Sequence, residues 1–202
     1  MSAILEPSYF SIASPNEGIY TDKGSKFIAI AIPIADEAEV KIRLEEIKKK
    51  HPKARHFCYA FQFGVTNISY RINDDGEPSG TAGKPIYGQI RSHELNDILV
   101  VVVRYFGGTL LGTGGLINAY KTAAATALES AQKIRKTPTK ILIIEFEFSL
   151  LNEVMKIVKQ KKVEILSKTI AAKCKMELRT SLQMEDEIRK QMLAINGLSI
   201  LE

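Results

Sequence analysis

The most constraining feature of this sequence is an apolar run that passes directly into a glycine-rich segment. Residues 98–106 read ILVVVVRYF, and residues 107–115 read GGTLLGTGG. A β-branched apolar run of this kind predicts a strand buried at the centre of a sheet. Apolar side chains recur at helical spacing from Leu116 and Tyr120 onward, so we expect a helix that ends near the basic KIRK at 133–136. The predicted order is strand, glycine loop and helix.

The segments that precede this strand predict further strands and one more helix. Asp36 lies three residues before Glu39, which is typical of a helix capping box and predicts an amphipathic helix over about 36–50. Turn-forming residues separate the first two predicted strands, and we expect those two to pair in antiparallel fashion. The segments rich in β-branched and aromatic residues, which predict strands, are 9–13, 26–34, 56–63 and 68–72.

A domain boundary is predicted at KTPTK, residues 136–140, because Pro138 interrupts the pattern between a helix and a new alternating segment. This boundary gives an N-terminal domain over 1–136 and a C-terminal domain over 139–202. The order of elements in the second domain is the split βαβ pattern of ferredoxin-like folds, so the fold class of the chain is α+β. The predicted elements are strand 140–148, helix 149–161, strands 163–170 and 172–180, helix 183–194 and strand 197–201.

The composition excludes several classes of protein. Of 202 residues, 45% are hydrophobic and 25% are charged, which is typical of a globular chain and excludes wholesale disorder, collagen-like repeats and a disulfide scaffold. Cys58 and Cys174 lie far apart and outside any CxxC pattern, which favours a reducing cytoplasm. We expect no targeting or membrane-spanning segment, because no basic region is followed by a long apolar run. The net charge of +5 favours an anionic partner only weakly.

The glycine-rich segment 107–115 could present bare backbone N–H groups at a helix N-terminus, where a phosphate is stabilised. The segment lacks the Lys-Ser/Thr end of a Walker loop and the ribose-binding acid of a dinucleotide fingerprint. The alternative interpretation is that the glycines only allow tight packing of the loop and capping of the helix.

Three side chains at the end of the central strand could complete such a site. Arg104, Tyr105 and Phe106 offer one guanidinium and two aromatic rings, which could clamp a phosphate and stack a base. Strand alternation sends Tyr105 to the face opposite Arg104 and Phe106, so all three share a site only if the strand ends or twists there. The alternative is that Phe106 belongs to the core. Arg104 would then pair with Asp74 or Asp75.

Residues 74–85 read DDGEPSGTAGKP and combine three carboxylates, two hydroxyl groups and a lysine. Their composition opposes regular structure, and a loop of this length inside a compact domain is usually functional. A cation or phosphate site is conceivable, although the ligand spacing of an EF-hand is absent. The alternative is an ordinary turn rich in Asp and Gly.

His56 and Cys58 lie two residues apart on a predicted strand, so they share a face and could form a nucleophile–base pair or two metal ligands. No third ligand or orienting acid is spaced to join them. We therefore expect a buried cysteine and a hydrogen-bonded histidine, with no catalytic set, no metal and no cofactor.

Two segments together resemble the signature sequences of the IMPACT family, which includes bacterial YigZ-like proteins. They are DDGEPSGTAGKPI at 74–86 and VVVRYFGGTLLGTGGLINAY at 101–120. The resemblance covers essentially the whole chain. It implies an N-terminal domain similar to the second domain of ribosomal protein S-five and to domain IV of elongation factor G. It also implies a C-terminal ferredoxin-like domain similar to domain V of elongation factor G.

The resemblance implies a connection with translation, since eukaryotic members restrain an amino-acid-starvation kinase by competing for its ribosome-associated activator. For this chain it implies an RNA- or ribosome-binding regulator of translation rather than an enzyme, with the oligomeric state left open. The alternative is an enzyme or binding protein for a small phosphorylated ligand held at the glycine-rich loop. The site residues implied by position are Arg104, Tyr105, Phe106, Gly107, Gly108, Gly112, Gly114, Gly115, Glu77, Ser79, Thr81, Lys84 and Pro85, with His56 and Cys58 as weaker members.

Overall fold

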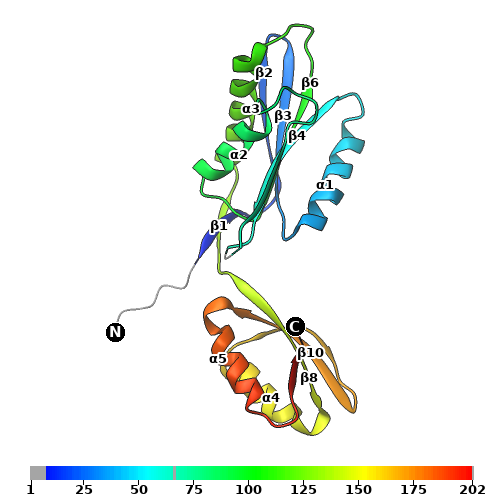
Figure 1. The fold of residues 1–202 in the computed structure, drawn as a ribbon, viewed down its shortest axis with the longest axis vertical. Helices are drawn as coiled ribbons and strands as arrows, with labels where there is room; N and C mark the ends of the chain where they lie inside the picture. The colour runs from blue at the N-terminus through cyan, green and yellow to red at the C-terminus, as the bar shows by residue number, and fades with distance from the viewer. Residues whose placement is uncertain (1–7, 66, 202) are drawn as a thin grey trace, which may run out of the picture. The chain divides into compact units, whose positions relative to one another are not determined.

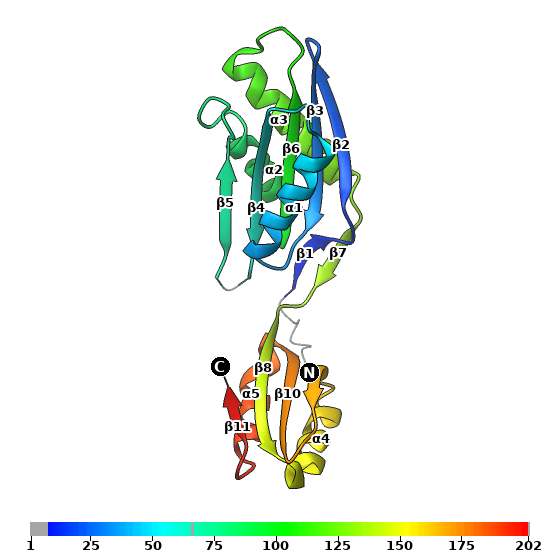
Figure 2. The ribbon, with the colours of Figure 1, turned by 90° about the vertical axis from the view of Figure 1, so that its right-hand side faces the viewer.

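The computed structural model describes residues 8–65 and 67–201, which divide into two compact units (Figure 1, Figure 2). Tyr9–Lys136 form the first unit, and residues 137–201 belong to the second. The first seven residues, where no targeting signal is expected, and the last residue lie outside the described range. None of the described helices is long and apolar enough to cross a bilayer.

The first unit is built on a five-stranded sheet with helices on both faces (Figure 2). The strands are β2 (Asn16–Asp22), β3 (Ser25–Pro33), β4 (His56–Phe63), β5 (Ser69–Asn73) and β6 (Ile98–Tyr105). Their order is β2-β3-β6-β4-β5, and every neighbouring pair is antiparallel. One face is covered by α1 (Glu37–Lys50), and the other by α2 (Gly83–Ser92) and α3 (Gly112–Glu129).

Strand β6 lies at the centre of this sheet, as its apolar run predicts. Residues 98–103 are fully buried. Val100 and Val102 join the core beneath α2 and α3, whereas Val101 and Val103 join the core beneath α1. Alternation along one strand therefore supplies both cores. This two-sided burial explains why the run carries no polar residue before its end.

Helix α1 begins where the capping-box pattern predicts. The Glu39 N–H donates to the Asp36 carboxylate at 2.9 Å, and the Ala35 N–H donates to the Glu39 carboxylate at 3.1 Å. Val40 and Ile47 bury the apolar face of the helix against the sheet. Three lysines fill the last turn, where cations stabilise the helix dipole.

The expected pairing of segments 9–13 and 26–34 is wrong. Strand β1 (Tyr9–Ile12) pairs with β7 (Lys133–Lys136), while β3 pairs with β2 and β6. The basic KIRK segment is therefore a strand and not a helix end, because α3 already ends at Glu129. Helix α3 also begins within the glycine-rich segment rather than after it.

Strand β2 begins in residues that the sequence predicts as a turn. It pairs with β3 from Asn16 onward, and a Cβ at Gly18 within it would overlap the backbone of Ala127. The missing side chain lets α3 pack directly against the strand. This contact joins segments more than a hundred residues apart, so no local pattern indicates it.

The segment 74–85 is not irregular throughout, because α2 begins inside it. The Asp74 carboxylate caps this helix by accepting backbone hydrogen bonds at 2.8 to 3.0 Å from Gly80, Ala82 and Gly83. Asp74 lies nine residues before Gly83, whereas the usual N-cap residue lies two or three residues before the N–H group that it accepts from. Composition alone therefore gave the wrong expectation for the second half of this segment.

The second unit is ferredoxin-like, as predicted. Its elements are β8 (Thr139–Glu147), a 3-10 turn (Phe148–Leu150), α4 (Leu151–Gln160), β9 (Glu164–Thr169), β10 (Lys173–Ser181), α5 (Leu182–Leu193) and β11 (Ser199–Leu201). The four strands form one antiparallel sheet in the order β11-β8-β10-β9, separate from the sheet that contains β6. With both units mixed in this way, the α+β fold class is confirmed.

Replacing Gly18 by alanine should destabilise the first unit, because the added methyl group would overlap the backbone at Ala127. Overpacking of this kind typically costs about 1–3 kcal/mol. Gly88→Ala is the matched control, because Gly88 is exposed in α2 with nothing within 4 Å of its Cβ position. The control should leave stability unchanged or raise it by up to about 1 kcal/mol. Urea unfolding followed by circular dichroism measures both, and equal stabilities would contradict the packing argument.

Candidate functional site

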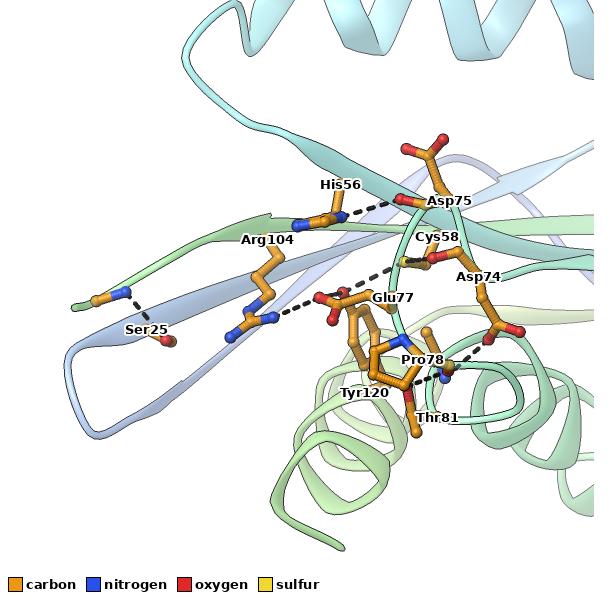
Figure 3. A network of polar contacts seen from close by, with 12 residues as sticks. Ser25, His56, Cys58, Asp74, Asp75, Glu77, Pro78, Thr81, Arg104 and Tyr120 are labelled. Carbon is orange, nitrogen blue, oxygen red and sulfur yellow. Dashed lines mark hydrogen bonds and ion pairs between the residues drawn. The ribbon is translucent and has the colours of Figure 1, made fainter. Parts of the chain in front are cut away.

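A buried ion pair between Arg104 and Glu77 lies at the end of β6 (Figure 3). Arg104 Nη1 is 2.5 Å from Glu77 Oε1, and the two side chains are 7% and 4% exposed. The Tyr120 hydroxyl donates to the same Oε1 at 2.8 Å, and Cys58 Sγ lies 3.3 Å from the Tyr120 hydroxyl oxygen. This chain of contacts joins β6, the loop 74–82, α3 and β4.

The guanidinium of Arg104 lies against two aromatic rings. The register of the sheet places Arg104 beside Phe27 of β3 and His56 of β4. Its central carbon is 5.5 Å from the centroid of the Phe27 ring and 5.6 Å from that of Phe106. A cation is attracted to an aromatic ring at such distances. Arg104 Nε is buried and has no hydrogen-bond partner among the described residues.

These contacts differ from the alternative in which Phe106 belongs to the core and Arg104 pairs with Asp74 or Asp75. Arg104 pairs with Glu77 rather than with Asp74 or Asp75, and Phe106 is 56% exposed rather than part of the core. The sequence also suggests a phosphate partner for Arg104. In the structure the Glu77 carboxylate already neutralises the charge of Arg104. The first role of the Arg104 side chain is therefore to stabilise the fold.

Tyr105 lies on the opposite face of the sheet from Arg104, as strand alternation predicts. Its hydroxyl forms a 2.8 Å hydrogen bond with Nδ1 of His51, at the C-terminal end of α1. Its ring packs against the core beneath α1. The structure therefore brings Arg104 and Phe106 together and leaves Tyr105 out of that group.

The loop 74–82 is organised around the carboxylate of Asp74. The three N–H groups that point at this carboxylate form a nest of the kind that binds anions. Burial alone would raise the pKa of Asp74, but these donors and the charge of Lys84 outweigh it and lower the pKa. Because the protein's own carboxylate occupies the nest, these donors are not directed at an external phosphate.

The other predicted residues of this segment have separate roles. The Thr81 hydroxyl donates to the Pro78 carbonyl at 2.7 Å, so it serves the loop itself. Pro85 lies in the first turn of α2, where a residue without an N–H group is tolerated. Ser79 and Lys84 are exposed. These last two side chains are the ones that present polar groups to solvent.

His56 and Cys58 lie on one face of β4, as predicted, and both contact the loop. His56 Nδ1 is 2.9 Å from the carbonyl oxygen of Asp75, and the Cys58 thiol donates to that of Asp74 at 3.0 Å. Burial raises the pKa of Cys58 to about 12, and the nearby carboxylates of Glu77, Asp75 and Asp74 act in the same direction. The thiol is therefore neutral at physiological pH. The described residues contain no group of three or more His, Cys, Asp or Glu side chains that could hold a metal ion.

The glycine-rich segment is fixed at its start and open at its end. The Gly107 N–H donates to Ser25 Oγ at 3.1 Å, and a Cβ at Gly107 would overlap the backbone of Gly24. A Cβ at Gly112 or Gly114, by contrast, would meet nothing within 4 Å. The first turn of α3 has neither a capping side chain nor an acidic residue. The N–H groups of this helix end are therefore left to solvent or to a ligand.

The structure brings most of the predicted residues to one end of the sheet. That end contains the last residues of β6, the first residues of β4, the β2–β3 turn and the N-terminus of α3 (Figure 1). The predicted residues in this region are Glu77, Ser79, Thr81, Arg104, Phe106, Gly107, Gly108, Gly112, Gly114 and Gly115, together with His56 and Cys58. Lys84 and Pro85 continue from the loop into α2.

Sequence reasoning missed three members of this region, Phe27, Asp74 as a helix cap, and Tyr120. A tyrosine on the alanine-rich face of a helix indicates a buried hydroxyl that needs a partner. That signal could have placed Tyr120 in a polar network. The roles of Phe27 and Asp74 depend on sheet register and on a folded loop, for which the sequence carries no local signal.

Comparisons with a family model and with curated proteins relate this chain to the same family. Residues 23–128, which contain all of the candidate site, match the family model described as "Impact N-terminal domain". The chain is 38% identical over 143 residues to "IMPACT family member YigZ" of Escherichia coli (strain K12), with 70% of each chain covered. It is 34% identical over 147 residues to "IMPACT family member YvyE" of Bacillus subtilis (strain 168), with 73% of this chain and 68% of that protein covered. A crystal structure described only as that of an hypothetical protein matches 98% of both chains at 30% identity, with a TM-score of 0.73.

A double-mutant cycle tests the buried pair. Arg104→Met leaves the Glu77 carboxylate buried without a counter-charge, and Glu77→Gln leaves the guanidinium in the same condition. Each single change should lower the free energy of unfolding by about 3–5 kcal/mol. The double change should cost clearly less than the sum, because it leaves no unpaired charge. Urea unfolding of the four proteins gives the coupling energy.

The matched control is the exposed pair of Arg179 and Glu164 in the second unit. Arg179→Met and Glu164→Gln should show a coupling of only about 0–1 kcal/mol, because water screens both charges. Simple additivity at Arg104 and Glu77 would mean that the two charges do not depend on each other.

The Cys58 thiol should be inert in the folded protein. Cys58 and Cys174 are both buried, so Ellman's reagent at neutral pH should react with neither until urea unfolds the chain. Because the pKa of Cys58 is raised from 9.0 to about 12, its contribution to stability is present below about pH 9 and is lost as the pH rises toward about 12. Cys58→Ser does not titrate in this interval and should lose less stability across it. Fast labelling of native protein would contradict this account.

Proposed function

Because this chain belongs to the IMPACT family, we propose that it regulates translation in the cytoplasm by binding RNA, either free or within the ribosome. The proposed interface is the end of the five-stranded sheet that holds the N-terminus of α3, which we call the α3 end. Family membership supports the link with translation through the role of the eukaryotic members. The open N-terminus of α3 is the observation that carries the proposed interface.

The two helix N-termini on this face of the sheet differ in a way that supports the proposal. That of α2 is capped by Asp74. That of α3 begins with Gly112, has no side-chain cap, and carries no acidic residue in its first turn. Unpaired N–H groups and the positive end of the helix dipole both stabilise a phosphate at such a position. Glycines with open space around them allow a phosphate to approach the backbone closely.

The charges around the α3 end also favour a polyanion. Lys23 lies in the β2–β3 turn, next to Gly24, whose backbone is in contact with Gly107. Asp75 is an exposed carboxylate in the same region. Against it stand three exposed basic residues, Lys23, Arg55 and Lys84, whereas Lys26 lies opposite Tyr105 on the face of the sheet that α1 covers. An excess of exposed cations should make the affinity for RNA fall with salt.

Gly114→Glu should weaken RNA binding, because it places a carboxylate where we propose that a phosphate lies. The fold should tolerate the change, since Gly114 is exposed in α3 and has open space at its Cβ position. We expect a loss of about tenfold, which corresponds to about 1.4 kcal/mol. The slope of log affinity against log salt should fall by about one. Fluorescence anisotropy with a labelled RNA oligonucleotide of mixed sequence, and co-sedimentation with purified ribosomes, measure these effects.

Gly88→Glu is the matched control, because it adds the same charge at an exposed helical glycine of α2 beyond its first turn. It should bind like the wild type. Equal RNA affinities of Gly114→Glu and Gly88→Glu at every salt concentration would contradict the proposal that a phosphate binds at the α3 end. Saturable binding of a small phosphorylated compound by a wild type that binds neither RNA nor ribosomes would replace the proposal with the small-ligand alternative.

A further inference from the structure

Phe106 presents an aromatic ring to solvent directly after a strand whose side chains are almost all buried. Its side chain is 56% exposed, whereas residues 98–103 are fully buried. Leu110, in the same connection to α3, is 82% exposed. The open N-terminus of α3 begins two residues later, at Gly112. An apolar surface therefore adjoins the helix end at which we propose that a phosphate binds.

The ring of Phe106 rests on the guanidinium of Arg104, at 5.6 Å from the central carbon to the ring centroid. That guanidinium is held in turn by Glu77, and the Tyr120 hydroxyl donates to the same carboxylate oxygen. The residue after the ring, Gly107, is fixed by its contacts with the β2–β3 turn. The guanidinium therefore lies over one face of the ring, and more than half of the side chain stays exposed to solvent.

An aromatic ring with a cation on one face and solvent on the other is suited to stack with a third planar group. Nucleobases stack on exposed aromatic side chains in proteins that bind single strands, largely without regard to sequence. The contact with Arg104 adds to this, because attraction between the guanidinium and the ring favours the observed position of the ring. In a duplex the faces of the bases are already covered by neighbouring bases, so a duplex offers no free face to Phe106.

We propose that Phe106 stacks on an unpaired base of an RNA strand whose phosphate lies at the N-terminus of α3. This inference rests on the proposed function and adds a substrate class to it, single-stranded RNA rather than duplex RNA. The phosphate contact supplies affinity that falls with salt, whereas stacking supplies a preference for unpaired bases.

Phe106→Trp provides a direct readout, because the chain contains no tryptophan. Stacking of a base on the introduced indole should quench its fluorescence in step with binding of single-stranded oligo(A). A duplex of the same length should quench it much less. Phe106→Leu keeps an apolar side chain but cannot stack, and should bind oligo(A) about tenfold more weakly. Its affinity for the duplex should change little.

Phe148 of the second unit provides the matched control, because it is exposed to a similar degree, at 54%. Phe148→Trp should show no quenching in step with binding, and Phe148→Leu should bind oligo(A) like the wild type.

The outcomes separate this inference from the proposed function. Unchanged oligo(A) affinity for Phe106→Leu, with no quenching in Phe106→Trp, would overturn the stacking. The proposed function would stand in that case if Gly114→Glu still weakened binding. Equal affinity of the wild type for oligo(A) and for the duplex would also overturn the inference. A wild type that binds neither oligo(A) nor ribosomes would contradict the proposed function and the inference together.

Discussion

The buried contact between Arg104 and Glu77 holds the candidate site together. Charges removed from water are tolerated only when they are paired and hydrogen-bonded, and here the Tyr120 hydroxyl gives the carboxylate a second donor. The three side chains come from β6, the loop 74–82 and α3, so a shift of any one segment would leave a buried charge unpaired. The same pair sets the position of the guanidinium against which Phe106 rests. Arg104 thus connects the buried contact with Glu77 to the exposed ring of Phe106.

The two helix N-termini on this face follow from the segments that lead into them. Asp74 comes directly after β5, so its carboxylate folds back onto the start of α2 and occupies the anion nest. Residues 106–111 contain no carboxylate, and the backbone of Gly107 is held by Ser25. This segment therefore supplies no side chain that could cap the N-terminus of α3. One helix end therefore stabilises the fold, and the other is the one that we propose for recognition.

Local patterns predicted the elements that local interactions determine. The apolar run predicted β6, the capping box predicted α1, and periodicity predicted the order of the second unit. The pairing of β1, strand β2 and helix α2 were missed, because no local pattern encodes their contacts. Strand β1 pairs with the distant β7, Gly18 of β2 packs on the backbone of α3, and Asp74 caps α2 from outside the usual position. The site shows the same division. Residue type and position made Arg104 a candidate, but its partner lies 27 residues away in a loop whose folded shape no spacing rule describes.

Burial and hydrogen bonds fix the protonation states of three groups in and around the buried network. Burial raises the pKa of Cys58 and that of Tyr120, and backbone donors lower that of Asp74 against the effect of its burial. Each of these shifts moves the group away from neutrality and fixes it in one protonation state. Groups that keep one protonation state and their hydrogen bonds are suited to hold a rigid surface, and we propose that the exposed ring of Phe106 and the open end of α3 are the parts of that surface that meet the RNA.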